Sequence, residues 1–266
     1  MKPLFIIGAV LTLALSFCFS FSWALLWQLP LLFLSVFLGV TLLYWLFWAF
    51  ACLPIQKQYS YDRPSPFYYR LLQSGYRFAC EGARARVQVT GLDKLPDTPF
   101  LLVSNHLSNF DNMIQSAALK DHQIAYISKP ENFRIPIGGR LIWRSCYLPI
   151  ERDNLRSSTR TIQKAAAMLR EGGVSMAVYP EGHRGHSYEL QPFHPGCLNA
   201  AIWANCPIVV STITGTEQIH TRFPFRSTEV HFDILETVET NGRRAADLSE
   251  EIRQTMQAHL NTYRKG

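Results

Sequence analysis

Residues 100–111 read Phe-Leu-Leu-Val-Ser-Asn-His-Leu-Ser-Asn-Phe-Asp. The first four residues form an apolar run typical of a buried β-strand, and the polar residues after them are typical of a turn. His106 and Asp111 are five positions apart, so their side chains would diverge on a continuous helix but can meet across a strand-to-helix turn. An Asp that orients a His produces a base able to take a proton from an alcohol. The stretch predicts an α/β fold that carries a His–Asp pair at the end of a strand.

A second motif follows another strand-like run, residues 174–179. It reads Pro-Glu-Gly-His-Arg at residues 180–184, where the proline ends the strand and the glycine lets the backbone approach a ligand. Arg184 offers a planar, permanently charged fork that suits a phosphate. Ligands bind at the carboxyl ends of parallel strands, so we expect both motifs to contribute to one site.

Strand-like and helix-like segments alternate along the rest of the chain. Apolar and β-branched content predicts strands at residues 86–90, 100–103, 124–128, 174–179, 208–213 and 230–235. Helical patterns cover residues 111–119, a segment capped by Ser157 or Ser158, residues 195–204 and residues 248–263. This order predicts an α/β domain with a largely parallel central sheet flanked by helices. The aromatic and basic segment 66–80 fits either a helix in a membrane surface or a core helix.

The N-terminal part of the chain belongs in a membrane, because residues 3–56 contain no charged residue and no His. A spanning helix needs about 20 apolar residues. We therefore expect a transmembrane hairpin in residues 1–57, with helices at 4–27 and 31–53 and a bend at 28–30, followed by one catalytic domain in residues 58–266. A cleaved secretory signal is the alternative, but the apolar region is much longer than a signal needs.

Charges and cysteines bear on the location of the catalytic domain. Lys2 precedes the apolar region and Lys57 and Arg63 follow it, so the positive-inside rule places both ends in the cytoplasm. The six cysteines include no Cys-x-x-Cys pair, which is typical of reduced thiols in a cytoplasmic protein. We expect a protein of the cell membrane, namely the bacterial inner membrane, with its catalytic domain facing the cytoplasm.

The net charge of +6 indicates which partners the domain prefers. Arginines are concentrated in residues 134–160, where few acidic residues oppose them. A basic surface beside a membrane anchor favours phosphates and an anionic membrane surface. Nucleic acid would suit the same charge, but no segment resembles a groove-reading module, so we expect no nucleic-acid partner.

Residues 105–111 and 180–184 together resemble the glycerolipid acyltransferase family, whose bacterial type member is lysophosphatidic acid acyltransferase. Further matching blocks are Lys-Pro-Glu at residues 129–131, Ile-Pro-Ile-Gly at 135–138, Ile-Glu-Arg at 150–152 and Phe-His-Pro-Gly at 193–196. The resemblance runs in family order from about Val89 to Thr214. His183 departs from it, because the family commonly has Thr at that position.

The resemblance implies a function and a role for each matching residue. His106 is the general base and Asp111 its orienting partner. Glu181, Gly182 and Arg184 would belong to the site for the acceptor's phosphate, and Lys129 and Arg152 could supply additional phosphate contacts. A fatty acyl group would pass from acyl-CoA or acyl-carrier protein to the membrane lipid 1-acyl-sn-glycerol 3-phosphate, giving phosphatidic acid. The thioester is a co-substrate, and neither a cofactor nor a metal is expected.

Several alternatives remain beside this interpretation. The same chemistry could use glycerol 3-phosphate, another lysophospholipid or a lyso-aminolipid as acceptor. Ser175 lies in a sequence faintly similar to a hydrolase nucleophile elbow, although without the required strand-to-helix turn. His183, His186, His194 and Cys197 have spacings that could ligate zinc. A non-catalytic lipid-binding protein of the same fold is a further alternative.

Overall fold

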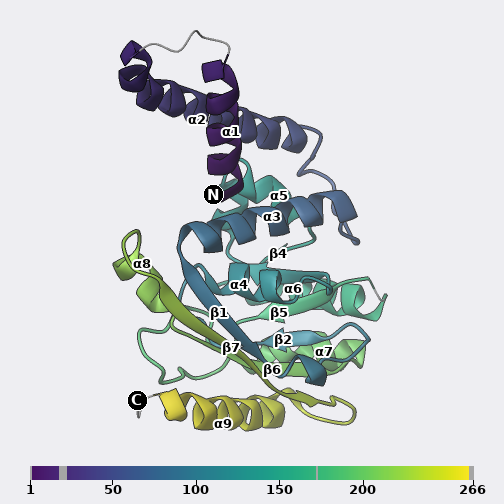
Figure 1. Ribbon diagram of the computed structural model, residues 1–266. Coiled ribbons are helices and arrows are strands. Elements are labelled where there is room, and N and C mark those ends of the chain that lie inside the picture. Colours follow the sequence, from purple (N-terminus) through teal and green to yellow (C-terminus); the bar gives the residue numbers. More distant parts are fainter. Residues whose placement is uncertain (1, 18–22, 172, 264–266) are drawn as a thin grey trace. The chain divides into compact units, whose positions relative to one another are not determined.

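The computed structural model describes residues 2–17, 23–171 and 173–263 (Figure 1). The chain divides into two compact units, Met1–Gln56 and Lys57–Gly266.

The first unit consists of helices α1 (Lys2–Phe17) and α2 (Trp23–Cys52), which pack against each other. The ring centroids of Phe5 and Phe33 lie 5.2 Å apart across this contact. Within the described residues, Gln28–Cys52 is the one helix long and apolar enough to cross a membrane, whereas the apolar helix Leu4–Ser16 is shorter. The predicted hairpin is therefore shown only in part: two apolar helices are present, but among the described residues only Gln28–Cys52 reaches spanning length.

The predicted bend at residues 28–30 is wrong, because Pro30 lies inside α2. Proline removes a single backbone N–H from the helix, and apolar helices tolerate this when the residues on both sides favour helix. Residues 18–22, between the end of α1 and the start of α2, lie outside the described part of the chain.

A seven-stranded sheet forms the centre of the second unit, in the order β1-β7-β6-β2-β5-β3-β4. Strands β6, β2, β5, β3 and β4 run parallel, whereas β7 is antiparallel to β6 and parallel to β1. The predicted α/β class with a largely parallel sheet is confirmed. The strands are β1 (Ala85–Thr90), β2 (Leu101–Val103), β3 (Ile124–Ser128), β4 (Leu148–Pro149), β5 (Ser175–Val178), β6 (Ile208–Thr214) and β7 (Thr228–Val238).

Helices cover both faces of this sheet. The helices are α3 (Pro66–Gly82), α4 (Asp111–Ala118), α5 (Gly138–Arg144), α6 (Leu155–Arg170), α7 (Asn199–Ala204), α8 (Ile219–Arg222) and α9 (Ala245–Tyr263), with short 3₁₀ turns at η1 (Leu92–Lys94), η2 (Pro130–Arg134), η3 (Pro195–Leu198) and η4 (Thr216–Gln218). Helix α4 connects β2 to β3 and α6 connects β4 to β5 in the opposite direction, so right-handed crossovers place them on opposite faces. Helix α3 packs on α4, whereas α9 packs on β6 and η3, and Figure 1 shows α3 and α9 on opposite sides of the sheet.

The structure settles one prediction that the sequence left open and corrects the predicted start of another helix. Helix α3 buries Tyr69, Leu72 and Tyr76, so segment 66–80 is a core helix of the second unit rather than a helix lying wholly in a membrane surface. Helix α6 begins three residues earlier than Ser158, because the Asn154 side chain accepts a hydrogen bond from the backbone N–H of Ser157 at 3.0 Å.

Candidate active site

The backbone that follows β2 is fixed before it reaches the candidate base. The side chain of Asn105, which is buried, donates to the backbone carbonyl of Ile213 at 2.8 Å and accepts from the backbone N–H of the same residue at 2.8 Å. This two-way bond joins the end of β2 to β6, its neighbour in the sheet. The turn that carries His106 therefore starts from a rigid position.

His106 and Asp111 meet across the turn between β2 and α4. The Nδ1 atom of His106 lies 2.8 Å from Oδ2 of Asp111. The backbone N–H groups of Leu107 and Ser108 donate to the same oxygen at 2.7 and 2.8 Å. Asp111 is fully buried, whereas the His106 side chain keeps 18% of its surface exposed. The buried carboxylate thus stabilises the turn through these hydrogen bonds, while the imidazole remains partly exposed.

The hydrogen bonds around Asp111 determine where the proton of the neutral imidazole lies. Two backbone N–H groups donate to Oδ2, and the Thr216 hydroxyl donates to Oδ1 at 2.5 Å. A carboxylate that receives donors on both oxygens acts as an acceptor, so the Nδ1 atom of His106 is the donor in its bond with Asp111. The Nε2 atom of His106 then keeps its lone pair and can accept a proton from a substrate.

An aromatic side chain fixes the plane of this imidazole. The rings of His106 and Tyr179 are stacked, with centroids 4.2 Å apart and an interplanar angle of 8°. Burial raises the pKa of Tyr179 well above its usual value, so its hydroxyl stays protonated. That hydroxyl donates to Oε1 of Gln115 at 2.9 Å. The imidazole is therefore held at its edge by Asp111 and on its face by Tyr179.

Glu181 joins the two sequence motifs. Its Oε1 accepts from the backbone N–H of His106 at 3.2 Å, and its Oε2 accepts from the backbone N–H of Gln191 at 3.0 Å. The backbone N–H of Gly185 also donates to the carbonyl of His106 at 2.7 Å. Burial raises the pKa of Glu181, while these N–H groups and nearby His106 act in the opposite direction. With both carboxylate oxygens facing backbone, Glu181 is placed to brace the loops rather than to meet a phosphate directly.

Gly182 is required by the local backbone. It has a φ of +76°, and a Cβ atom at this position would lie 3.1 Å from the His194 ring. Any other residue would therefore strain the backbone and press on that ring. This glycine allows the loop to turn between Glu181 and Arg184.

Arg184 reaches back to the first motif and stays open to solvent. Its guanidinium Nη1 donates to Oδ1 of Asn109 at 3.3 Å, and both side chains are exposed. Asn109 lies in the turn between His106 and Asp111. The structure thus brings together four of the residues singled out by the sequence: His106, Asp111, Glu181 and Arg184.

Lys129 and Arg152 lie at the same edge of the sheet as His106, but they follow strands that are farther from β2. Lys129 follows β3 and Arg152 follows β4, and both are exposed. The neighbouring strands run in the order β2-β5-β3-β4, all parallel. At about 4.8 Å between strands, β4 is roughly 14 Å from β2. Across the described residues, no hydrogen bond links Lys129 or Arg152 to the His–Asp pair.

Two alternative sites suggested by the sequence are not assembled. Ser175 lies within β5 and its hydroxyl oxygen accepts from the backbone N–H of Phe100, so it does not sit at a nucleophile elbow. In residues 2–17, 23–171 and 173–263, no group of three or more His, Cys, Asp or Glu side chains could hold a metal ion. His194, a member of the proposed zinc set, instead lies against Gly182.

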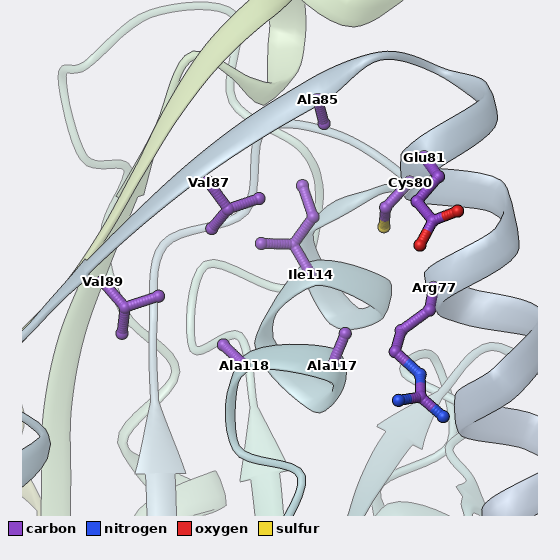
Figure 2. Close-up of a pocket in the computed structure, with 9 residues that line it drawn as sticks. All are labelled: Arg77, Cys80, Glu81, Ala85, Val87, Val89, Ile114, Ala117 and Ala118. Atoms are coloured by element: carbon purple, nitrogen blue, oxygen red, sulfur yellow. The ribbon is translucent and has the colours of Figure 1, made fainter. Parts of the chain in front are cut away.

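An apolar groove opens beside α4 (Figure 2). It has a volume of about 260 Å³ and lies between the C-terminal half of α3, strand β1 and helix α4. In Figure 2, Val87 and Val89 of β1 face Ile114 and Ala118 of α4 across it. Ile114 follows Asp111 by about one helical turn, so the groove is lined in part by the helix that carries Asp111.

Sequence reasoning missed Thr216. This residue lies in η4, is fully buried, and supplies the hydrogen bond to Oδ1 of Asp111. It is 105 positions away from Asp111 in the chain. A lone Thr after a strand carries no motif, and only the adjacency of β6 and β2 brings it to the site.

Comparisons with known proteins point to one family. The acyltransferase family model matches residues 86–214. The chain is 27% identical over 177 residues to 1-acyl-sn-glycerol-3-phosphate acyltransferase alpha of Ovis aries, covering 64% of this chain and 61% of that protein. It is 29% identical over 116 residues to 1-acyl-sn-glycerol-3-phosphate acyltransferase of Salmonella typhimurium, covering 44% of this chain and 47% of that protein. The chain thus spans less than two thirds of the length of these curated relatives.

A solved structure shares the fold. The 1-acyl-sn-glycerophosphate (LPA) acyltransferase PlsC from Thermotoga maritima superimposes with a TM-score of 0.64 at 21% identity, covering 84% of this chain and 89% of that chain. Thr216 falls just beyond the segment matched by the family model.

Replacing Thr216 tests whether its hydroxyl supports the buried carboxylate. Thr216→Val keeps the volume but leaves Oδ1 of Asp111 without a donor, which we expect to lower the free energy of unfolding by about 1–3 kcal/mol. Thr216→Ser keeps the hydroxyl and should cost less. Unfolding of the detergent-solubilised full-length protein measures both variants. A Ser variant as destabilised as the Val variant would assign the effect to packing rather than to the hydrogen bond.

Proposed function

We propose that the chain, whose residues 86–214 match the acyltransferase family model, is a membrane-bound enzyme that acylates a phosphorylated glycerolipid. The donor is a fatty acyl thioester, either acyl-CoA or acyl-carrier protein. The acceptor is 1-acyl-sn-glycerol 3-phosphate, and the product is phosphatidic acid. The observation that carries the proposal is the His106–Asp111 contact at 2.8 Å, which leaves Nε2 of a partly exposed imidazole as the free base.

The residues of the site account for each proton in this reaction. Nε2 of His106 takes the proton of the acceptor hydroxyl as its oxygen attacks the thioester carbonyl. The buried carboxylate of Asp111 stabilises the resulting imidazolium. When the tetrahedral intermediate collapses, the C–S bond breaks and the imidazolium returns its proton to the departing thiolate. A thiolate is a good leaving group, so the main task of the protein is to activate the alcohol.

The cationic side chains at this edge suit the acceptor's phosphate. Arg184 is exposed beside the catalytic turn, and its guanidinium can bind two phosphate oxygens at once. Lys129 and Arg152 follow strands β3 and β4 at the same edge, where they could bind the phosphate or attract it. Glu181 acts indirectly, because it holds the loop of Arg184 against the loop of His106.

The apolar groove beside α4 provides a place for the acyl chain. Its walls are mainly aliphatic, and it is lined in part by the helix that carries Asp111. Burial of methylene groups along such a wall favours binding by about 0.8 kcal/mol for each group. The charged side chains of Arg77 and Glu81 also contribute to its lining.

The membrane location also belongs to the proposal. Helix α2 is long enough to span a bilayer, and an anchored enzyme would find its lipid acceptor in the same membrane. The flanking Lys2, Lys57 and Arg63 favour a cytoplasmic position for both ends of the apolar region, with the second unit at the inner face of the cell membrane.

A panel of acceptors tests the function directly. The purified full-length protein is supplied with acyl-CoA or acyl-carrier protein and with glycerol 3-phosphate, 1-acyl-sn-glycerol 3-phosphate, other lysophospholipids and a lyso-aminolipid. Mass spectrometry should detect acylation of 1-acyl-sn-glycerol 3-phosphate above the others. His106→Ala should lower the rate by about 10²–10⁴-fold, the usual contribution of a general base. Acylation of a different lysolipid would change the acceptor, and full activity of His106→Ala would remove the proposed base.

Arg184 is expected to act mainly in acceptor binding. Arg184→Ala removes charge-assisted hydrogen bonds worth about 1.5–3 kcal/mol, so KM for the phosphorylated acceptor should rise by roughly 10–150-fold. Arg184→Lys keeps the positive charge but loses the planar guanidinium, so its KM should lie between those of the unmodified protein and of Arg184→Ala. Steady-state kinetics at saturating donor measure both. An unchanged KM in the Ala variant would place the phosphate elsewhere.

Filling the groove should change acyl-chain preference. Ala118→Phe adds a ring between β1 and α4, so kcat/KM for long-chain acyl-CoA should fall relative to that for a short-chain donor. Ala167→Phe, at a half-exposed alanine on α6, is the matched control and should leave the ratio unchanged. If the ratio of kcat/KM for long-chain and short-chain donors were the same in both variants, the groove would not be the binding site of the acyl chain.

A further inference from the structure

The segment between β6 and β7 leaves the body of the second unit and ends in two exposed aromatic side chains. Phe225 is 85% exposed and Phe223 is 49% exposed. Figure 1 shows α8 and its tip projecting at the left, beyond the edge of the sheet. We refer to residues 219–226 as the α8 loop. Neighbouring exposed Phe side chains are unfavourable in water, so this loop is suited to an apolar or interfacial surface.

The charged residues of this loop are all basic. Arg222 and Arg226 flank the two Phe residues, and residues 218–228 contain no Asp or Glu. Arg84, from the turn before β1, donates from Nη1 to the backbone carbonyl of Phe225 at 3.1 Å. All three arginines are exposed. The loop thus combines an apolar tip with a cationic surround, which matches the headgroup and upper acyl region of an anionic bilayer.

The same pairing recurs at the carboxyl ends of other strands. Ile135, which follows β3, is 52% exposed beside Arg134, and Leu155, which follows β4, is 82% exposed near Arg156. These strands are parallel to β6, so the three features lie at one edge of the sheet. Spread over four strand spacings of about 4.8 Å, they suit a broad surface better than a single peptide groove.

The base of the α8 loop contacts the catalytic turn. The His220 ring lies with its centroid 5.5 Å from that of Phe110, the residue before Asp111. The η4 turn just before the loop supplies Thr216, which donates to Asp111. A loop held in a lipid surface at its tip would therefore place that surface beside the site.

We propose that the α8 loop is a lipid-contact element of the second unit, in which Phe223 and Phe225 enter an anionic bilayer while Arg84, Arg222 and Arg226 contact lipid phosphates. This contact is additional to the apolar helices of the first unit. It does not depend on acyl transfer, so the loop would bind lipid even if the chain acylated another acceptor or none.

Photocrosslinking in the full-length protein tests the contact. The probe is p-benzoylphenylalanine in place of Phe225, and the matched control carries it in place of Trp203, a 41% exposed aromatic residue on α7, which precedes β6. Each protein is reconstituted in vesicles of phosphatidylcholine alone or mixed with phosphatidylglycerol, and adducts are identified by mass spectrometry. We expect several-fold more lipid adduct at position 225 than at 203, increased by phosphatidylglycerol and reduced by salt.

A charge reversal separates the arginines from the rings. Arg222→Glu with Arg226→Glu, made in the protein carrying the probe at 225, should abolish the preference for phosphatidylglycerol. Equal lipid adducts at 225 and 203, adducts to a second copy of the chain in place of lipid, or an unchanged preference after the charge reversal would each overturn the proposal.

Discussion

The candidate site depends on the hydrogen bonds that the buried carboxylate of Asp111 accepts. It receives a hydrogen bond from His106, two from the backbone of the turn and one from Thr216. These bonds define the turn, select the protonated nitrogen of the imidazole, and join the β2 loop to the segment after β6. A buried carboxylate needs such partners because desolvation without them is strongly unfavourable. The geometry of the base and the stability of the loops therefore have a common origin.

The parallel sheet explains why residues distant in the chain act together. Strands β6, β2, β5, β3 and β4 all end at one edge, so their loops bring Thr216, His106, Arg184, Lys129 and Arg152 to the same side. Glu181 strengthens this arrangement by bonding to the backbone of both motif loops. The exposed apolar side chains after β3, β4 and β6 lie at this edge as well, so a lipid surface and a lipid substrate would approach from the same direction.

Local patterns predicted the fold class and the meeting of His106 with Asp111, because strand periodicity and turn residues are properties of short segments. The reversed direction of β7 was not predictable, since a strand's sequence does not specify the direction of its neighbour. Pro30 was taken as a bend although its apolar surroundings continue the helix. The family resemblance placed Glu181 in the phosphate site but could not indicate that its oxygens accept from the backbone N–H groups of His106 and Gln191, because folding brings these groups near. Thr216 gave no local signal.

The tautomer of His106 tests the central claim most directly. The full-length protein, labelled with ¹⁵N-histidine and held in lipid nanodiscs, can be compared with His106→Ala to identify the signals of this ring. We expect the neutral ring to carry its proton on Nδ1, hydrogen-bonded to Asp111, with Nε2 unprotonated. A neutral ring protonated on Nε2 would contradict the role of Asp111 and leave the proposed base without its lone pair.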